Sequence, residues 1–142
     1  MKKINNKKLV KSKIAYVLGG LGLLGKEISD QLCDEGIKVV ILDIKNKPKK
    51  KKLGITYEKF DLTHLNEIDK NITKVFSKHG YPDIFINASY PRTSEWKNAT
   101  FKKLKLNSLT ENVNIHMNSS AWIAIIIANL MKKKIKKDLL FF

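Results

Sequence analysis

The residues with the clearest chemical potential lie between Lys13 and Asp43. Gly20, Gly22 and Gly25 have the spacing G-x-G-x-x-G, which follows a short apolar run and precedes a segment with helical periodicity. Glycines at these positions allow a tight turn, a close approach of the backbone to a pyrophosphate and close packing of the next helix. The helix N-terminus also presents free N–H groups to phosphate oxygens. The pattern therefore predicts that this segment binds a dinucleotide.

Asp43 supplies the acid that such a site requires. It ends the apolar run Lys38–Leu42, 18 residues after Gly25, close to the offset expected for a carboxylate that binds an adenosine ribose. A carboxylate there accepts hydrogen bonds from the ribose hydroxyls and repels a 2′-phosphate, so we expect NAD rather than NADP. The basic run Asn46–Lys52 offers the opposite interpretation, in which lysines meet a cofactor phosphate. Runs of like charge are usually solvated loops, however.

Strands and helices alternate along the rest of the chain. Short apolar or alternating runs predict four strands, at Ile14–Leu18, Lys38–Leu42, Ile55–Phe60 and Asp83–Ala88. Strands that alternate with helices imply a parallel sheet with right-handed crossovers. We therefore predict an α/β fold with a doubly wound, Rossmann-like sheet of four to five strands. Residues 1–13 would form a basic lead-in and residues 14–142 a single domain.

Periodic apolar residues indicate which helix faces are buried. The first helix, which Gly36 stops, is expected to bury Leu24, Ile28 and Leu32. The second, capped by Thr63 and stopped by Gly80, is expected to bury Leu65, Ile68, Ile72, Val75 and Phe76. A polar loop at Ser89–Lys105 and a third helix over about Leu109–Lys133 follow, with one helix face formed by Leu109, Val113, Met117, Ala121, Ala124 and Ala128. Residues 138–142 would begin a fifth strand or form an exposed apolar end.

The composition is typical of a globular protein in a reducing compartment. The chain has 142 residues, 43% of them hydrophobic, which is enough for one domain with a core. The single cysteine, Cys33, excludes an internal disulfide and is consistent with the cytoplasm. No apolar run of signal-peptide length follows the basic N-terminus, and the run Ala121–Met131 is too short to span a bilayer. The histidines show no metal-site spacing.

The formal net charge of +15 is typical of proteins that bind nucleic acid or an anionic surface. Arg92 is the only arginine, however, and arginine is the preferred residue for bidentate contacts to phosphates and bases. We therefore do not expect nucleic acid to be the partner. A basic RNA- or membrane-surface binder remains an alternative, and it predicts a steep dependence of binding on salt.

The chain resembles the short-chain dehydrogenase/reductase family of NAD(P)-dependent oxidoreductases. The matching residues, between about Lys13 and Met131, are Gly19, Gly22, Gly25, Asp43, Asp61, Asn87 and Ala88. The resemblance implies that the pyrophosphate is bound by the loop Gly19, Gly20, Leu21, Gly22, Leu23, Leu24 and Gly25. It implies that Asp43 binds the adenosine ribose, Asp61 the adenine amino group and Leu62 the adenine ring. Asn87, with Ala88 and Ser89 beside it, would support the sheet and the cofactor's ribose.

Several positions depart from the family's pattern. Leu18 replaces a threonine, Leu23 occupies the middle glycine of the commonest spacing, and Ser89 replaces the glycine of N-A-G. His116 occupies the position of an asparagine that the family carries on this helix, and Asn114 and Asn118 flank it. His116 could take the role of that asparagine or be an ordinary structural histidine. Arg92 would bind an anionic substrate group or be a surface charge. The stretch Tyr90–Trp96 resembles a branch linked to bacterial surface-glycan or flagellin modification.

The family's catalytic serine and Tyr-x-x-x-Lys have no counterpart here. The residues four positions after the four tyrosines are Gly20, Asp61, Phe85 and Ser94. In the family this tyrosine is the general acid/base, and members are commonly near twice this length. We therefore expect a cofactor-binding portion of an oxidoreductase that acts on carbonyl or alcohol substrates, inactive by itself. The alternatives are a non-catalytic nucleotide-binding or regulatory module and a decayed gene fragment.

An unfinished sheet would leave an exposed edge and uncovered apolar surface. We therefore expect marginal stability, or pairing with a second copy or a complementary chain. The residues do not identify the substrate.

Overall fold

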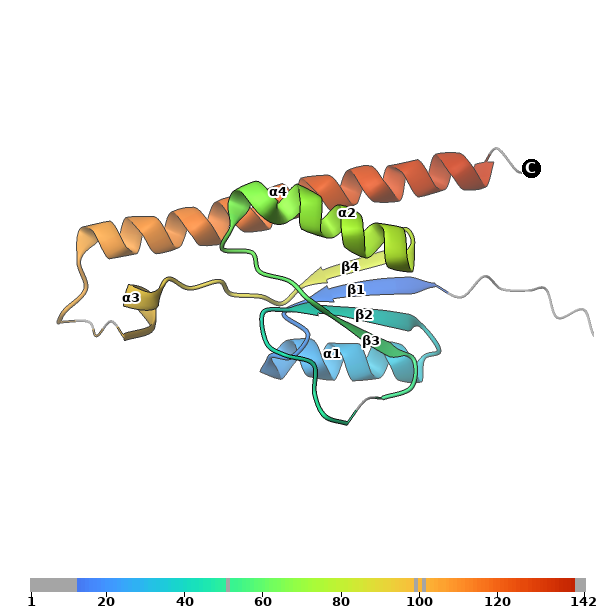
Figure 1. Ribbon diagram of the computed structural model, residues 1–142, viewed down its shortest axis with the longest axis horizontal. Coiled ribbons are helices and arrows are strands. Elements are labelled where there is room, and N and C mark those ends of the chain that lie inside the picture. Colours follow the sequence, from blue (N-terminus) through green and yellow to red (C-terminus); the bar gives the residue numbers. More distant parts are fainter. Residues whose placement is uncertain (1–12, 51, 99, 101, 140–142) are drawn as a thin grey trace, which may run out of the picture.

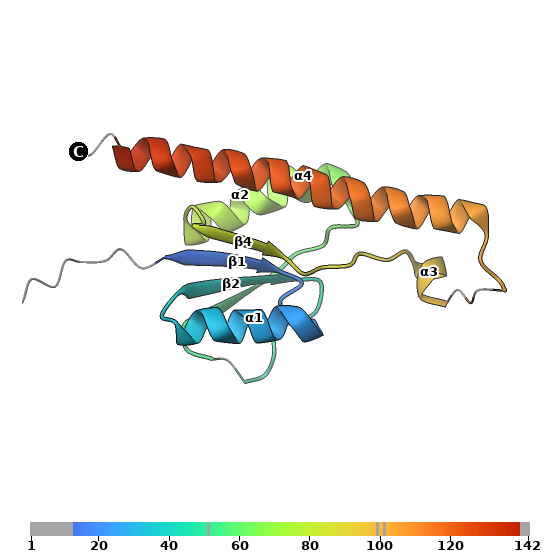
Figure 2. The same ribbon diagram turned by 180° about the vertical axis from the view of Figure 1, so that it is seen from behind.

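A computed structural model describes residues 13–50, 52–98, 100 and 102–139. Four strands form one parallel sheet in the order β3-β2-β1-β4, with β1 at Ile14–Leu18, β2 at Lys38–Asp43, β3 at Ile55–Lys59 and β4 at Ile84–Asn87. Helix α1 (Leu23–Asp34) covers one face of the sheet. The short helix η1 (Leu65–Glu67), helix α2 (Ile68–His79) and helix α4 (Leu106–Leu139) lie on the other face (Figure 1, Figure 2). The predicted doubly wound α/β architecture is confirmed.

The register of the strands brings their carboxyl ends to one edge of the sheet. Leu18, the last residue of β1, pairs with Leu42 of β2 and with Asn87 of β4. The strand order proceeds from β1 to β2 and β3, and the chain then returns to place β4 on the other side of β1. A crevice at such a reversal, outside the carboxyl ends of the strands, is the usual ligand site of an open α/β sheet.

Alternate side chains of the strands build two apolar clusters, because successive side chains of a strand point to opposite faces. Tyr16 and Leu18 belong to the cluster beneath α2 and α4, whereas Val17 belongs to the cluster beneath α1. The Tyr16 hydroxyl donates a 2.6 Å hydrogen bond to the Gly80 carbonyl. Burial raises the pKa of Tyr16 to about 12, so this group stays protonated and serves the core.

Helix α2 buries the face that the sequence predicts, with Ile68 and Ile72 fully buried. The predicted cap is wrong. A single turn of tighter helix at Leu65–Glu67 precedes α2, and the Thr63 hydroxyl instead donates a 2.8 Å hydrogen bond to Asp61 Oδ1. The nearby carboxylate is the stronger acceptor for this hydroxyl, so Thr63 closes the turn after β3 rather than the helix.

Helix α1 turns the predicted face toward the sheet only in part, since Leu32 packs against the core cluster of Val17 but Leu24 does not. Leu24 is 72% exposed, whereas Gly25 and Ser29 are buried and Ile28 and Leu32 are half-buried. The physical reason is the close approach of Gly25 to the loop that precedes the helix, since this contact turns Leu24 outward. The predicted stop is correct, because Gly36 follows the last turn with φ +78°.

Helix α4 is longer than predicted and is rotated from the expected orientation. The predicted face includes Val113 and Met117, which are 49% and 60% exposed. The buried residues are instead Ser108, Asn112, Ser119, Ile123 and Ile127. The C-terminal half packs its isoleucines over the sheet, whereas the N-terminal half extends beyond the sheet beside α3 (Ser94–Asn98) and buries polar residues there (Figure 1). The spacing of apolar residues did not predict this buried face, because part of it consists of serine and asparagine.

Helix α4 also leaves apolar side chains on the surface, among them Met117, Trp122, Ile125 and Ile135. Within the described part of the chain it is the one helix long and apolar enough to cross a membrane by length and composition. Its residues Ile123 and Ile127 nevertheless lie in the core cluster with the sheet. Pairing of this surface with a second chain stays a prediction.

The structure differs from two other expectations. The segment predicted as a polar loop, 89–105, contains α3, and residues 138–139 belong to α4 rather than to a fifth strand. The expectations for residues 1–12, for Lys51 and for residues 140–142 lie outside the described residues.

Asp83 joins the start of β1 to α4. Its Oδ2 accepts a 2.8 Å hydrogen bond from the Ile14 amide, and its Oδ1 lies 2.5 Å from the Lys134 Nζ. Burial acts to raise the pKa of Asp83, but the bonds from Lys134 and Ile14 outweigh burial, and the pKa is lowered. A lowered pKa contributes stability that is present above the unfolded value of about 3.9 and is lost as the pH falls through the folded value.

We predict that Asp83→Asn lowers the free energy of unfolding by about 1–3 kcal/mol at neutral pH, since the variant loses a charge-assisted contact. The difference from the parent chain should shrink as the pH falls through the acid range, because Asp83 is then protonated in both states. Urea unfolding followed by circular dichroism at several pH values measures both effects. Glu111→Gln, at an exposed site on α4, is the control. A difference that does not change with pH would contradict this account of Asp83.

Candidate functional site

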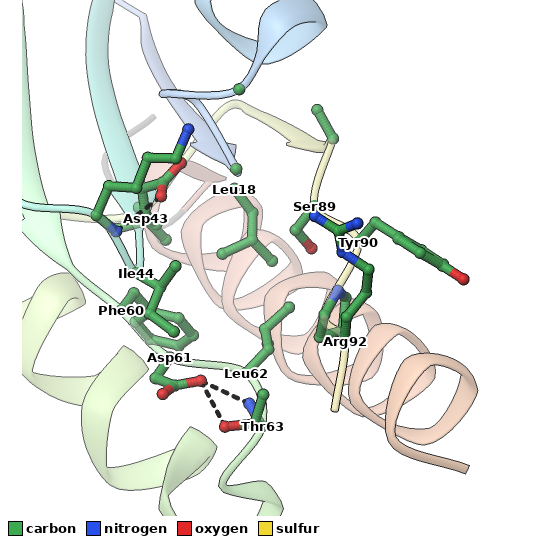
Figure 3. Close-up of a pocket in the computed structure, with 16 residues that line it drawn as sticks. Leu18, Asp43, Ile44, Phe60, Asp61, Leu62, Thr63, Ser89, Tyr90 and Arg92 are labelled. Atoms are coloured by element: carbon green, nitrogen blue, oxygen red, sulfur yellow. Dashed lines mark hydrogen bonds between the residues drawn. The ribbon is translucent and has the colours of Figure 1, made fainter. Parts of the chain in front are cut away.

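A cavity of about 500 Å³ opens at the carboxyl edge of the sheet (Figure 3). The carboxyl ends of the strands and the segments just beyond them line it: Leu18, Gly19 and Gly22 at β1; Leu42, Asp43, Ile44 and Lys45 at β2; Phe60, Asp61, Leu62 and Thr63 after β3; and Ala88, Ser89, Tyr90, Pro91 and Arg92 after β4. The cavity therefore occupies the crevice where the strand order reverses, the position expected for a ligand.

The glycine loop after β1 passes close to two other backbone segments. Gly19 has φ +75°, and a Cβ built on it would lie 2.8 Å from the Ala88 backbone. A Cβ on Gly25 would overlap the Gly19 carbonyl oxygen. The Gly19 amide donates a 2.7 Å hydrogen bond to the Leu42 carbonyl, which fixes the turn against β2. Glycine at 19 and 25 is thus a steric requirement of the loop.

The first glycine of the motif has a different role from the one predicted. The turn out of β1 is made by Gly19, whose backbone is left-handed, and not by Gly20. Gly20 instead faces the Ile41 side chain, which would lie 2.8 Å from an added Cβ. The structure therefore agrees with the G-x-x-G-x-x-G spacing of the family resemblance, Gly19, Gly22 and Gly25, rather than with the G-x-G-x-x-G that begins at Gly20. Gly22 is the residue before the first turn of α1 and lines the cavity.

Asp43 holds the glycine loop from the neighbouring strand. Its Oδ2 accepts a 2.9 Å hydrogen bond from the Leu21 amide, and its Oδ1 accepts a 2.9 Å hydrogen bond from the Lys45 amide. The residue is 7% exposed and lines the cavity. A carboxylate oxygen has two acceptor positions, so each oxygen keeps one for a ligand. Asp43 can therefore position the loop and bind a diol at the same time.

The wall after β3 combines an apolar surface with an acid. Phe60 and Leu62 are buried and point into the cavity, with Asp61 between them (Figure 3). Asp61 Oδ1 accepts hydrogen bonds of 2.8 Å from both the amide and the hydroxyl of Thr63. This closed turn fixes the carboxylate. A flat heterocycle with an amino group fits such a wall, because its ring can pack on the leucine while the amino group donates to the acid.

The wall after β4 is connected to α4. The Asn87 Oδ1 accepts hydrogen bonds from the amide and hydroxyl of Ser89, at 3.1 and 2.6 Å, and its amide donates to the Ser120 hydroxyl at 3.3 Å. Asn87 thus closes the turn after β4 and does not line the cavity itself. Further along, Arg92 extends beside the Tyr90 ring.

The chain matches the family model of the short chain dehydrogenases over residues 13–140. The chain belongs to this family. A search of curated protein sequences gave no match. Among solved structures it is similar to aldohexose dehydrogenase from Thermoplasma acidophilum, with a TM-score of 0.68 and 18% identity over 84% of this chain and 44% of that one.

It is also similar to a short chain dehydrogenase from Leptospira borgpetersenii with bound NAD+, with a TM-score of 0.69 and 21% identity over 87% of this chain and 47% of that one. A third similar structure is 4-hydroxyisoleucine dehydrogenase complexed with NADH, with a TM-score of 0.68 and 18% identity over 87% of this chain and 51% of that one. The chain spans about half the length of each of these three proteins.

Not every residue expected from the family resemblance reaches the cavity. Those that line it are Gly19, Gly22, Asp43, Asp61, Leu62, Ala88, Ser89 and Arg92. Those that do not line it are Gly20, Leu21, Leu23, Leu24, Gly25, Asn87 and His116. Leu23 and Leu24 are exposed on the first turn of α1. Leu21 reaches the site through its amide, which is bonded to Asp43.

The helix position of the family's asparagine does not take part in the cavity. His116 packs edge-on against Tyr90, with ring centroids 4.7 Å apart, and its Nδ1 is buried without a hydrogen-bond partner among the described residues. Asn114 and Asn118 are exposed and bond to each other. The α4 residue that meets the end of β4 is Ser120. Ser120 lies four positions, about one helical turn, after His116 and accepts a hydrogen bond from the Asn87 side-chain amide at 3.3 Å.

Several lining residues were missed by the sequence argument, including Lys45, Phe60, Thr63 and Tyr90. Each lies within two residues of a predicted site residue and follows a strand. Their position just after a predicted strand could have identified them, because residues beyond the carboxyl ends of the strands lie near the crevice where the strand order reverses.

We predict that Gly25→Ala lowers the free energy of unfolding by about 1–3 kcal/mol, because the new methyl group would displace the Gly19 carbonyl and the loop beyond it. Lys26→Ala, at the next and exposed position of α1, is the matched control and should stay within about 0.5 kcal/mol of the parent. Urea denaturation monitored by circular dichroism measures both variants. Equal stability of the two would show that α1 does not press on the loop as described.

Proposed function

We propose that this chain binds NAD and forms the cofactor-binding portion of a short-chain dehydrogenase-type oxidoreductase that acts on a carbonyl or alcohol substrate. The observation that carries the proposal is the position of the Asp43 carboxylate. It accepts a hydrogen bond from the Leu21 amide of the glycine loop and also lines the cavity. A sharp glycine turn and a carboxylate on the next strand together match the two ends of a nucleotide diphosphate: the phosphates and the ribose.

The residues present fit such a cofactor. Gly19 and Gly22 line the cavity near the N-terminus of α1 and carry no side chains, so a pyrophosphate could approach the backbone there closely. Asp43 would accept the hydroxyls of the adenosine ribose. Leu62 would pack on the adenine ring, and Asp61 would accept its amino group. Two of the similar solved structures are described with NAD+ or NADH, which supports a nicotinamide dinucleotide.

The choice of NAD over NADP rests on the charge of Asp43, because its carboxylate repels a 2′-phosphate. The second candidate is NADP, and one observation favours it. A smaller pocket on the β3 side of Asp43 is lined by Lys45, Lys47 and Lys59, together with Glu58. Lysine side chains there could neutralise a phosphate. Lys45 also reaches the loop, with its Nζ 3.4 Å from the Leu21 carbonyl, but the Asp43 carboxylate is nearly buried and bonded to the Leu21 amide at 2.9 Å, so we assign NAD.

A bound nicotinamide would supply the hydride donor or acceptor. This chain's residues would bind and orient the cofactor and would exclude water from its adenosine half, where Phe60 and Leu62 are buried. The 142 residues contain no Tyr-x-x-x-Lys, so they offer no general acid/base of the family's kind. A non-catalytic nucleotide-binding module remains the alternative. The narrower assignment to surface-glycan modification rests on Tyr90–Trp96 alone and stays a proposal.

We predict that the chain binds NADH and that Asp43→Asn weakens this binding about tenfold or more. The amide has one acceptor oxygen instead of two, and its NH2 group would face a backbone donor, either Leu21 or Lys45. The preference for NADH over NADPH should also narrow. Isothermal titration calorimetry measures both affinities, with Asp30→Asn on α1 as the control. If the parent chain does not bind NADH, the proposed function is wrong.

We also predict that the 142-residue chain shows no dinucleotide-dependent turnover. With NADH and simple carbonyl compounds, or with NAD+ and alcohols, absorbance at the nicotinamide band should change no faster than in a blank without protein. The physical reason is the missing proton donor, since general acid/base catalysis contributes about 10²–10⁴-fold in rate. Turnover by the purified chain would contradict this prediction.

A further inference from the structure

Arg92 lies across the cavity from the two acids. It is the only arginine of the chain, and it lines the cavity together with Ser89 and Tyr90, whereas Asp43 and Asp61 lie on the other side (Figure 3). Its guanidinium is turned back beside the Tyr90 ring, with the Cζ atom 6.0 Å from the ring centroid. An aromatic face at this distance attracts a cation, so the ring holds the charge at the cavity wall.

The backbone that carries Arg92 is anchored by a buried side chain of α4. Asn112 is 2% exposed, and its Oδ1 accepts a 3.1 Å hydrogen bond from the Thr93 amide. Its amide nitrogen donates to the Tyr90 hydroxyl at 3.4 Å. Tyr90 in turn packs edge-on against His116. The residues around Arg92 are therefore fixed to the helix, and a buried asparagine with both ends bonded is a stable anchor.

The charge of Arg92 is not neutralised within the described part of the chain. The ion pairs found there join lysines or histidines to acids, and none includes Arg92. The hydrogen bonds among these residues do not include its guanidinium as a donor either. A guanidinium presents a planar fork of N–H donors that matches two oxygens of one carboxylate or phosphate. A cation held at a cavity wall with its donors free is suited to an incoming oxyanion.

The adenosine half of the cofactor assigned above would lie away from Arg92. The phosphates would lie at the glycine loop after β1 and the adenosine ribose at Asp43 on β2, whereas Arg92 follows β4 on the opposite side of β1. A second ligand that enters the crevice on the β4 side, beside the nicotinamide half, would therefore meet Tyr90 and Arg92. Lys45 is the other cation that lines the cavity, and it lies beside Asp43, with its Nζ 3.4 Å from the Leu21 carbonyl.

We propose that Arg92 binds an oxyanion, a carboxylate or a phosphate, carried by the substrate that enters this cavity beside the cofactor. The inference rests on the proposed function, since a substrate site is meaningful only if the cavity binds the dinucleotide. It names the substrate as an anionic molecule. It also makes Asn112 a positioning residue, because this side chain fixes the segment from which Arg92 extends.

Because the chain has a single arginine, the proposal can be tested on one NMR signal. Arginine labelled with ¹⁵N gives one Nε–H resonance in this chain. The labelled full chain is saturated with NADH and titrated separately with inorganic phosphate and with acetate, at constant ionic strength set by chloride. A saturable shift of the resonance in the millimolar range with either anion, absent with chloride alone, is the expected result. A saturable shift with phosphate indicates that the substrate carries a phosphate, and one with acetate indicates that it carries a carboxylate.

Two variants sharpen the measurement. Lys45→Gln removes the other cation of the cavity and should leave the titration of the Arg92 resonance unchanged. Asn112→Ala should weaken the anion response several-fold while NADH still binds within about twofold of the parent affinity. An equal loss of NADH and anion binding would mean that Asn112 only maintains the fold, and the positioning role would be rejected.

The outcomes separate the two proposals. If calorimetry shows NADH binding but neither anion shifts the resonance, Arg92 has no oxyanion site and the proposed function stands. If NADH alone shifts the resonance to saturation and blocks any response to anions, Arg92 binds the cofactor's phosphates and the substrate assignment is wrong. If NADH does not bind, the proposed function is wrong and the substrate assignment is rejected with it.

Discussion

The hydrogen bond from the Leu21 amide to the Asp43 carboxylate is the contact on which the site depends. The glycine loop has few side chains of its own to hold it, because Gly19, Gly20 and Gly22 carry none. An acceptor from the neighbouring strand supplies the missing constraint. The carboxylate is nearly buried, and a buried charge is tolerated when hydrogen bonds satisfy it, so the loop and the acid stabilise each other. The loop is therefore shaped before any ligand arrives.

The parallel register explains why so many polar groups converge at one edge of the sheet. All four strands end at the same side, and the turns after β3 and β4 are each closed by a side chain of their own, Asp61 and Asn87. These turns face the loop after β1 across the crevice. The result is a cavity with acids on one wall and a single guanidinium on the other, although the chain as a whole carries a large positive charge. Local placement, rather than net charge, decides the chemistry of the cavity.

Helix α4 serves two purposes along its length. Its C-terminal half places Ile123 and Ile127 in the core, where their burial stabilises the sheet. Its N-terminal half extends beyond the sheet and buries Asn112, whose hydrogen bonds fix the segment after β4. The same helix therefore stabilises the core and fixes the segment of the cavity wall that carries Arg92. The exposed apolar residues between these halves are not covered within the described structure.

Much of the fold is determined by the sequence alone, because it depends on local patterns. Buried strands and stop glycines set the α/β alternation, and the acid at the end of the second strand follows from its distance along the chain. The sequence did not determine which glycine makes the turn, which face of α4 is buried, or that Asn112 anchors the Arg92 segment. Gly19 and Gly20 are alike in sequence, but only Gly19 has a left-handed backbone, and they face different neighbours, Ala88 in one case and Ile41 in the other. The buried face of α4 depends on polar partners far away in the chain. Such features are set by contacts between distant segments, and only the tertiary structure brings those segments together.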